Sequence, residues 1–302
     1  MGLDKKFIRA GIVTAGLGLL ATPLLANHSW GNYHWATASG VVEVPVIDNT
    51  TGVWQTSSPF GTGNYVRVAV DDWNKSENIN SSLSSGNADS SCPLVVGEIH
   101  VCNGDYGDTG WVGIASISTY RGRDSHIAGG ITKLNDYFFD TYTAANGTKP
   151  YDNPTWRQLV TCQEIGHDYG LGHQNENFST DATTSCMEYT SKPADNEHPD
   201  AHDYEQLAEI YAHDGGGTDP SPGPGKGGGK GGKNKVTVGN TPAAWGQAIG
   251  YDAQGRANMF KRSTNSFDIY THVTWAPHVE GGNGHDHEAE PRRHSGERVF
   301  NF

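Results

Sequence analysis

Residues 162–173, which read C-Q-E-I-G-H-D-Y-G-L-G-H, constrain this chain of 302 residues more than any other stretch. On a helix Gln163 and His167 share one face because they lie four residues apart, and Glu164 follows about 100° round the axis. Gly170 can take a positive φ, end the helix and turn the chain back, so that the last histidine faces the first. The stretch therefore predicts several ligands around one metal with a carboxylate beside it. Zinc suits the imidazoles.

This pattern resembles the long motif of the metzincin metallopeptidases, H-E-x-x-H-x-x-G-x-x-H. His167, Gly170 and His173 match its later positions. Glu164 matches the general base, whereas Gln163 stands where the family has its first histidine. The resemblance implies zinc held by Gln163, His167 and His173. It also implies an α+β catalytic domain in which a twisted mixed sheet lies over the metal-binding helix, and peptide hydrolysis by a metal-activated water with Glu164 as base.

A second short pattern, C-M-E-Y at residues 186–189, resembles the methionine turn that follows the metzincin motif. The resemblance places Met187 beneath the metal and gives Tyr189 a role in stabilising the transition state, where its phenol can donate to the oxyanion. In the same family an edge strand of the sheet pairs with extended substrate, a form of β-augmentation. Residues 111–118 are the candidate for that edge strand.

The amide of Gln163 leaves three interpretations open, because it is neutral and a poorer zinc donor than imidazole. Gln163 either ligates through its oxygen or holds a water, which leaves His167 and His173 as the strong ligands. The chain is then an active zinc endopeptidase, a catalytically silent metzincin-like pseudoprotease that acts as a secreted binding protein, or a site for another metal. Glu164 favours the enzyme, since a binding protein does not need a carboxylate at that position.

Residues 1–26 have the pattern of a secretory leader. Lys5, Lys6 and Arg9 precede an apolar core, and Ala26 is a small residue at a cleavage position. The apolar run is short for a membrane span, although an uncleaved anchor is the alternative interpretation. We expect a secreted protein with no stable membrane insertion after the leader is cleaved.

Four cysteines fit an oxidising compartment and allow three pairings. Cys92 and Cys102 flank an apolar run and are close in sequence, so we expect them to pair. Cys162 lies on the metal helix and Cys186 precedes the methionine, and a bridge between them would stiffen the floor of the site. The alternative for Cys162 is a buried free thiol.

The net charge of −13 argues against a nucleic acid as partner, because phosphate binding needs a basic surface. An acidic surface tolerates bound cations such as Ca²⁺ besides the zinc. We expect a monomer, and the resemblance to metzincins implies a protein or peptide substrate as its partner.

Composition divides the chain after the leader into four parts. A catalytic domain is expected at residues 27–213, a Gly/Pro/Lys linker at 214–235, a small β unit at 236–277 and a disordered tail at 278–302. The β unit contains a hairpin turn at 252–256. Whether it binds a polymer or packs on the main domain stays open.

Periodicity and capping signals predict three helices and several strands in these parts. We expect helices at 64–75, from 153 through the metal motif, and at 200–213, with strands at 41–47 (an edge strand because of Pro45), 94–101, 111–118, 127–134 and 271–275. His28, His34, His202 and Asp203 fit structural positions better than ligand positions.

Overall fold

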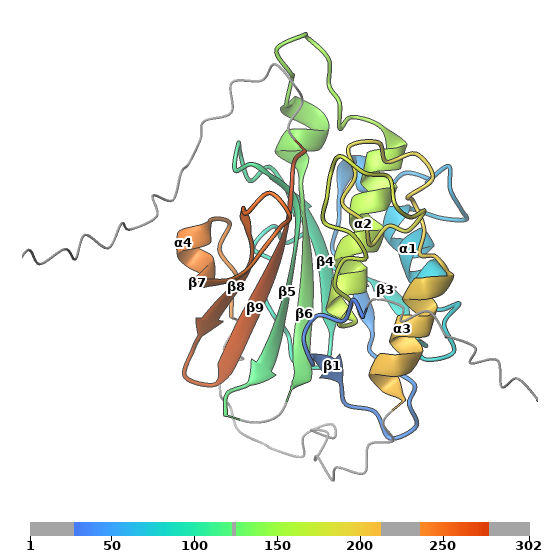
Figure 1. Cartoon of the computed structure of the whole chain (residues 1–302), viewed down its shortest axis with the longest axis vertical. Coiled ribbons are helices and arrows are strands. Elements are labelled where there is room, and N and C mark those ends of the chain that lie inside the picture. Colours follow the sequence, from blue (N-terminus) through green and yellow to red (C-terminus); the bar gives the residue numbers. More distant parts are fainter. Residues whose placement is uncertain (1–26, 123–124, 213–235, 278–302) are drawn as a thin grey trace, which may run out of the picture.

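The computed structural model describes residues 27–122, 125–212 and 236–277, and shows a nine-stranded mixed sheet with three helices packed on one face (Figure 1). The predicted α+β class is confirmed at this level. The predicted leader, the linker at 214–235 and the tail at 278–302 lie outside the described residues.

The described elements follow the predicted order closely. The helices are α1 (Tyr65–Trp73), α2 (Pro154–Asp168), α3 (Ala201–Tyr211) and α4 (Pro242–Trp245), with a 3₁₀ turn at Gly52–Gln55 and a π turn at Tyr137–Thr141. The strands are β1 (His34–Trp35), β2 (Val46–Asp48), β3 (Leu83–Ser85), β4 (Ile99–Gly104), β5 (Trp111–Tyr120), β6 (His126–Asn135), β7 (Gln247–Tyr251), β8 (Ala257–Ser263) and β9 (Phe267–Trp275).

The sheet order is β3-β2-β4-β6-β5-β9-β8-β7, with β1 also paired to β6. The pairs from β3 to β6 are parallel, and those from β6 to β7 are antiparallel. The expectation of an edge strand at 41–47 is wrong, because β2 pairs with β3 on one side and β4 on the other. Pro45 does not prevent this, since it lies just before the strand and its carbonyl accepts from Ile99.

Strand β5 is also an internal strand, which corrects the expectation of an open edge at residues 111–118. It pairs with β6 on one side and with β9 along its whole length on the other. The β unit at 236–277 therefore packs on the main domain and continues its sheet. Its predicted hairpin turn is confirmed, because the Asp252 amide donates to the carbonyl of Arg256 (2.9 Å) between β7 and β8.

Helix α2 begins and ends as its sequence predicts. The Asn153 side chain accepts from the amide of Trp156, and Pro154 occupies the first turn. Gly170, just beyond the end of the helix, takes φ +96°. A residue with a side chain would be strained in this conformation, so the turn that returns the chain needs glycine.

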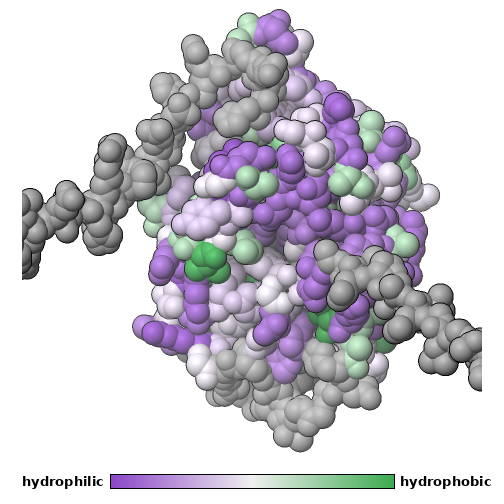
Figure 2. Space-filling model, viewed as in Figure 1, coloured by the Kyte–Doolittle hydropathy of each residue, from purple (hydrophilic) through white to green (hydrophobic). Residues whose placement is uncertain are grey.

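Two hydrophobic cores lie on opposite faces of the sheet. The first contains buried residues of α1, α2 and α3, and the second contains the Cys92–Cys102 disulfide with Trp111 and residues of the β unit such as Trp245 and Val273. The outer surface in Figure 2 is mostly hydrophilic, with isolated hydrophobic residues. Among the described residues, no helix has the length and apolar character to cross a membrane.

Candidate metal centre

Three histidines from three segments meet between α2 and the sheet. His167 comes from the last turn of α2, His173 from the chain after Gly170, and His272 from β9, where it lies opposite Ala115 of β5. Their ligand nitrogens lie within 4.8 Å of one another, and the three form a group that can hold a metal ion. The rings of His167 and His272 stack at 4.1 Å, and that of His173 stands edge-on to both.

The hydrogen-bond partners of the first two imidazoles favour one tautomer of each ring. Nδ1 of His167 lies 2.8 Å from the carbonyl oxygen of Leu171, and Nδ1 of His173 lies 3.3 Å from Oε1 of Glu176. The Leu171 carbonyl only accepts, so Nδ1 of His167 carries its proton and its Nε2 presents a lone pair; an ionised Glu176 favours the same tautomer of His173. This is the arrangement found at protein metal sites, where the second ring nitrogen donates to an oxygen.

The two Nε2 atoms face each other at 3.1 Å. With both rings in the Nδ1–H tautomer, the two lone pairs would repel unless a cation lay between them; in the other tautomer of one ring, its Nε2 donates to the other Nε2. Metal–nitrogen bonds of about 2.0–2.1 Å at a tetrahedral centre place two ligand nitrogens roughly 3.3 Å apart. The observed separation is therefore close to the spacing of two ligands on one metal.

Burial keeps these imidazoles in the neutral form. It lowers the pKa of His167 to about 4 and the pKa values of His173 and His272 well below the usual value. A neutral imidazole is the form that binds a metal.

The Gln163 amide, expected as the first ligand, bonds to other groups. Its Nε2 donates to the carbonyls of Cys186 (2.7 Å) and Glu188 (3.1 Å), and its Oε1 accepts from the Thr274 hydroxyl (2.8 Å). In this arrangement Gln163 ties α2 to the methionine turn and to β9, and His272 is the side chain that joins the two motif histidines.

Glu164, expected as the general base, lies on the side of α2 that faces β5. Its carboxyl group is completely buried, and neither oxygen has a hydrogen bond of ordinary geometry among the described residues, although the nearby Thr274 hydroxyl partly offsets the effect of burial on its pKa. Gly113 makes room for it, since a Cβ there would lie 2.5 Å from Oε1. Burial raises the pKa of Glu164 well above its usual value. A buried carboxyl group without partners and with a raised pKa is typical of a functional position.

Tyr189 and Met187, the two residues expected from the methionine turn, lie close to α2. The Tyr189 ring packs 4.0 Å from the His173 ring, and its hydroxyl donates to the carbonyl of Val273 (2.9 Å). Met187 is buried against the helix, where a Cβ at Gly166 would lie 2.5 Å from its Sδ. The phenol of Tyr189 is thus committed to β9 in this arrangement.

The predicted disulfides are both present, Cys92–Cys102 and Cys162–Cys186. The second joins α2 to the residue before Met187. Because Gln163 also bonds to the carbonyl of Cys186, the helix and the methionine turn are linked covalently and by hydrogen bonds at adjacent positions.

The N-terminal segment covers the histidines from one side. The Trp30 ring stands edge-on to His167 and His272 with centroids 5.8 and 5.7 Å away, and its side chain is buried. The Trp30 amide donates to the carbonyl of Gly170 (2.7 Å), which holds this segment to the turn after α2. The segment thus shields the centre from solvent on this side.

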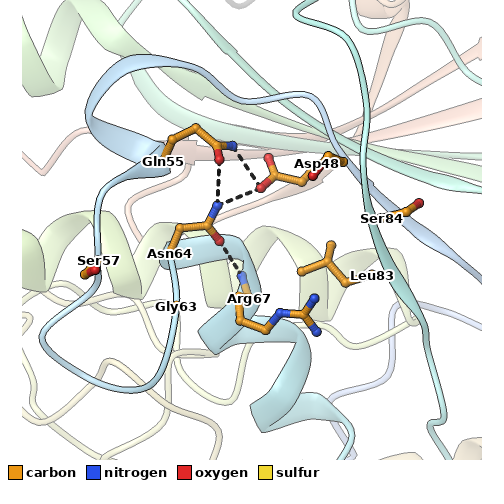
Figure 3. A pocket seen from close by; sticks show the side chains of 9 residues that line it. Asp48, Gln55, Ser57, Gly63, Asn64, Arg67, Leu83 and Ser84 are labelled. Atoms are coloured by element: carbon orange, nitrogen blue, oxygen red, sulfur yellow. Dashed lines mark hydrogen bonds between the residues drawn. The ribbon is translucent and has the colours of Figure 1, made fainter.

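A polar pocket of about 310 Å³ lies elsewhere, between the end of β2 and the start of α1 (Figure 3). Asn64 Nδ2 and Gln55 Nε2 both donate to the Asp48 carboxylate, at 2.8 and 3.0 Å. Asn64 also accepts from the amide of Arg67, as the N-cap of α1. These side chains satisfy one another, so we assign them a structural role. None of the three histidines lines this pocket.

Sequence reasoning did not identify His272. The available signal was the alternation in β9, where Tyr270, His272 and Thr274 face α2 while Ile269 and Val273 belong to the opposite core. An imidazole on a strand face directed at a metal motif is a candidate ligand. That face, however, is known only once β9 has been paired with β5.

No protein-family model matches the chain, and a search of curated proteins finds no match. The resemblance to metzincins therefore depends on residues 162–189, and the geometry of the three histidines has to carry the functional argument.

Proposed function

We propose that this chain is a secreted zinc-dependent endopeptidase of metzincin-like organisation, whose metal is held by His167, His173 and His272. The observation that carries the proposal is the meeting of three ligand nitrogens within 4.8 Å, with two Nε2 atoms 3.1 Å apart and an oxygen beside Nδ1 of both His167 and His173. Three imidazoles with an open fourth position are a ligand set of catalytic zinc. The leader pattern and the two disulfides support secretion.

The chemistry assigns separate roles to the residues around this centre. Zinc, when bound, supplies a Lewis acid that polarises a carbonyl and lowers the pKa of water. Glu164 would be the base: a bound cation would favour its ionised form against the burial that raises its pKa, and an Oε atom would then accept the proton of the attacking water and return it to the leaving nitrogen. Tyr189 supports the ring of His173 in the described arrangement, and Gln163 fixes α2 to the methionine turn. Trp30 excludes bulk water from the histidines.

A silent secreted binding protein is the second candidate function, and the pairing of β9 with β5 favours it. An extended peptide cannot add to β5 while β9 occupies that edge. Trp30 and Tyr189 also cover the histidines that a substrate would have to approach. In this alternative the metal stabilises the fold, and Glu164 does not take part in a reaction.

The test combines metal analysis with hydrolysis of a denatured protein such as casein. We expect close to one zinc per native chain, and hydrolysis that Glu164→Gln removes without loss of zinc. Hydrolysis unaffected by Glu164→Gln would contradict the role of this carboxyl. Zinc without hydrolysis in the native protein would favour the binding protein, and absence of zinc would reject both forms of the metal proposal.

A further inference from the structure

The carboxylate that touches a metal-site histidine is Glu176, which follows the matched motif. Its Oε1 lies 3.3 Å from Nδ1 of His173, and its side chain is 32% exposed, whereas Glu164 is fully buried. Glu176 is also the charged side chain that raises the pKa of His167, against the larger effect of burial. Glu176 is therefore a charged group that faces the histidines, although burial has the larger effect on the pKa of His167.

The chain around Glu176 is fixed in place by the methionine turn. The Gln174 amide donates to the carbonyl of Met187 (2.7 Å), and the Asn175 side chain donates to Glu188 (2.8 Å). Because both preceding residues are held, Glu176 projects towards His173 from a defined position.

A residue of the β unit holds the carboxylate from the other side. Asn258 of β8 is fully buried, and its Nδ2 donates to Oε1 of Glu176 (3.0 Å) and to the hydroxyl of Tyr189 (3.4 Å). Tyr189 in turn packs on the ring of His173. A buried amide would lose free energy if its donors were unpaired, so these contacts fix the orientation of Asn258 as well.

We propose that Glu176 and Asn258 are positioning residues of the metal centre: Glu176 holds His173 in the tautomer that presents Nε2, and Asn258 acts through Glu176. This inference rests on the proposed metal site. It means that the β unit sets the metal affinity twice, by supplying His272 and by orienting His173 through Asn258. Groups that hold a ligand histidine contribute roughly 10–100-fold to metal affinity.

The test measures the zinc affinity of the full chain by competition with a chromophoric chelator, without substrate. We expect Glu176→Ala to weaken binding about 10–100-fold. Glu176→Gln should recover part of the loss, since its amide oxygen still accepts from Nδ1–H. Asn258→Ala should weaken binding less, and the double variant no more than Glu176→Ala alone, because Asn258 acts through Glu176. Asn258→Ser serves if the alanine variant does not fold.

The matched control is Glu77→Gln, which removes the same charge from an exposed position beyond α1 and should leave the affinity unchanged. Long-range ¹H–¹⁵N spectra of the metal-free protein should show Nδ1 of His173 protonated in the native chain and the tautomers mixed in Glu176→Ala. Native zinc affinity in folded Glu176→Ala, or losses that simply add in the double variant, would overturn the inference while leaving the metal site intact. A native chain that binds no zinc would overturn both.

Discussion

Residues 154–189 and residues 236–277 both contribute to the candidate metal centre, but by different routes. The first region supplies His167 and His173 from one helix and the turn that follows it, with the Cys162–Cys186 bridge as a brace. The second supplies His272 from a strand, and its position depends on the pairing of β9 with β5. A ligand on a helix is placed by the helix itself, whereas a ligand on this strand is placed by the whole sheet.

The two regions also differ in what holds them. Gln163 and the disulfide fix the helix to the methionine turn within the first region. The β unit is held to the main domain by the second core and by Lys133 of β6, whose buried ammonium donates to the carbonyl of Val238 (2.7 Å) and to Asn240. Both regions supply histidines to the candidate centre. We therefore expect substitutions in either region to change its affinity for a metal.

The strongest test of the comparison is His272→Ala. We expect a loss of zinc affinity greater than the 10–100-fold that removal of an outer hydrogen-bonding group costs, because a ligand itself is removed. Zinc titration and the melting temperature without metal should be measured together. Affinity equal to that of the native chain would mean that the first region binds the metal alone.

The second largest effect is expected from removing the Cys162–Cys186 disulfide of the first region. The Cys162→Ala, Cys186→Ala double variant should lower the free energy of unfolding by about 3 kcal/mol, from the larger conformational freedom of the unfolded chain. Denaturant unfolding measures this loss. The corresponding Cys92 and Cys102 variant is the control, and the shorter loop that it opens should cost somewhat less. A larger loss of stability in the Cys92 and Cys102 variant would mean that the disulfide of the second core contributes more to stability than Cys162–Cys186.

Gln163→Ala should lower stability by about 2 kcal/mol while leaving zinc bound. The substitution strands two buried carbonyls and the Thr274 hydroxyl that the amide now satisfies, and unpaired buried groups of this kind are costly. Urea unfolding and zinc stoichiometry should be compared with those of His272→Ala. Loss of zinc in Gln163→Ala without a change in stability would restore Gln163 as a ligand.

The last prediction concerns the second region, and its effect is confined to alkaline pH. Burial lowers the pKa of Lys133 to about 8 in the folded chain, below the usual value near 10.5. The unfolded chain therefore binds more protons between these values, and the free energy of unfolding should rise with pH from about 8, by up to about 1.4 kcal/mol per unit. Lys133→Met should remove this contribution, as the difference between the two pH profiles would show. Parallel profiles would contradict a buried ammonium.

Much of the first region could be predicted from sequence because its determinants are local. The cap at Asn153, the spacing of Gln163 and His167 and the positive φ of Gly170 depend on residues within a few turns of helix, and the structure confirms the helix they define. The cysteine pairs also followed from position. The role of Gln163 could not be predicted from nearby residues, because its hydrogen-bond partners come from the methionine turn and from β9.

The sequence by itself determined the α+β class, the metal helix, the pair of motif histidines and the two disulfides. Only the tertiary structure decided that β5 is covered, that His272 joins the centre and that Asn258 reaches Glu176. The physical reason is that helix periodicity fixes side-chain direction over a few residues. The register and partner of a strand depend instead on packing across the whole sheet, and a shift of one residue would turn His272 to the opposite face.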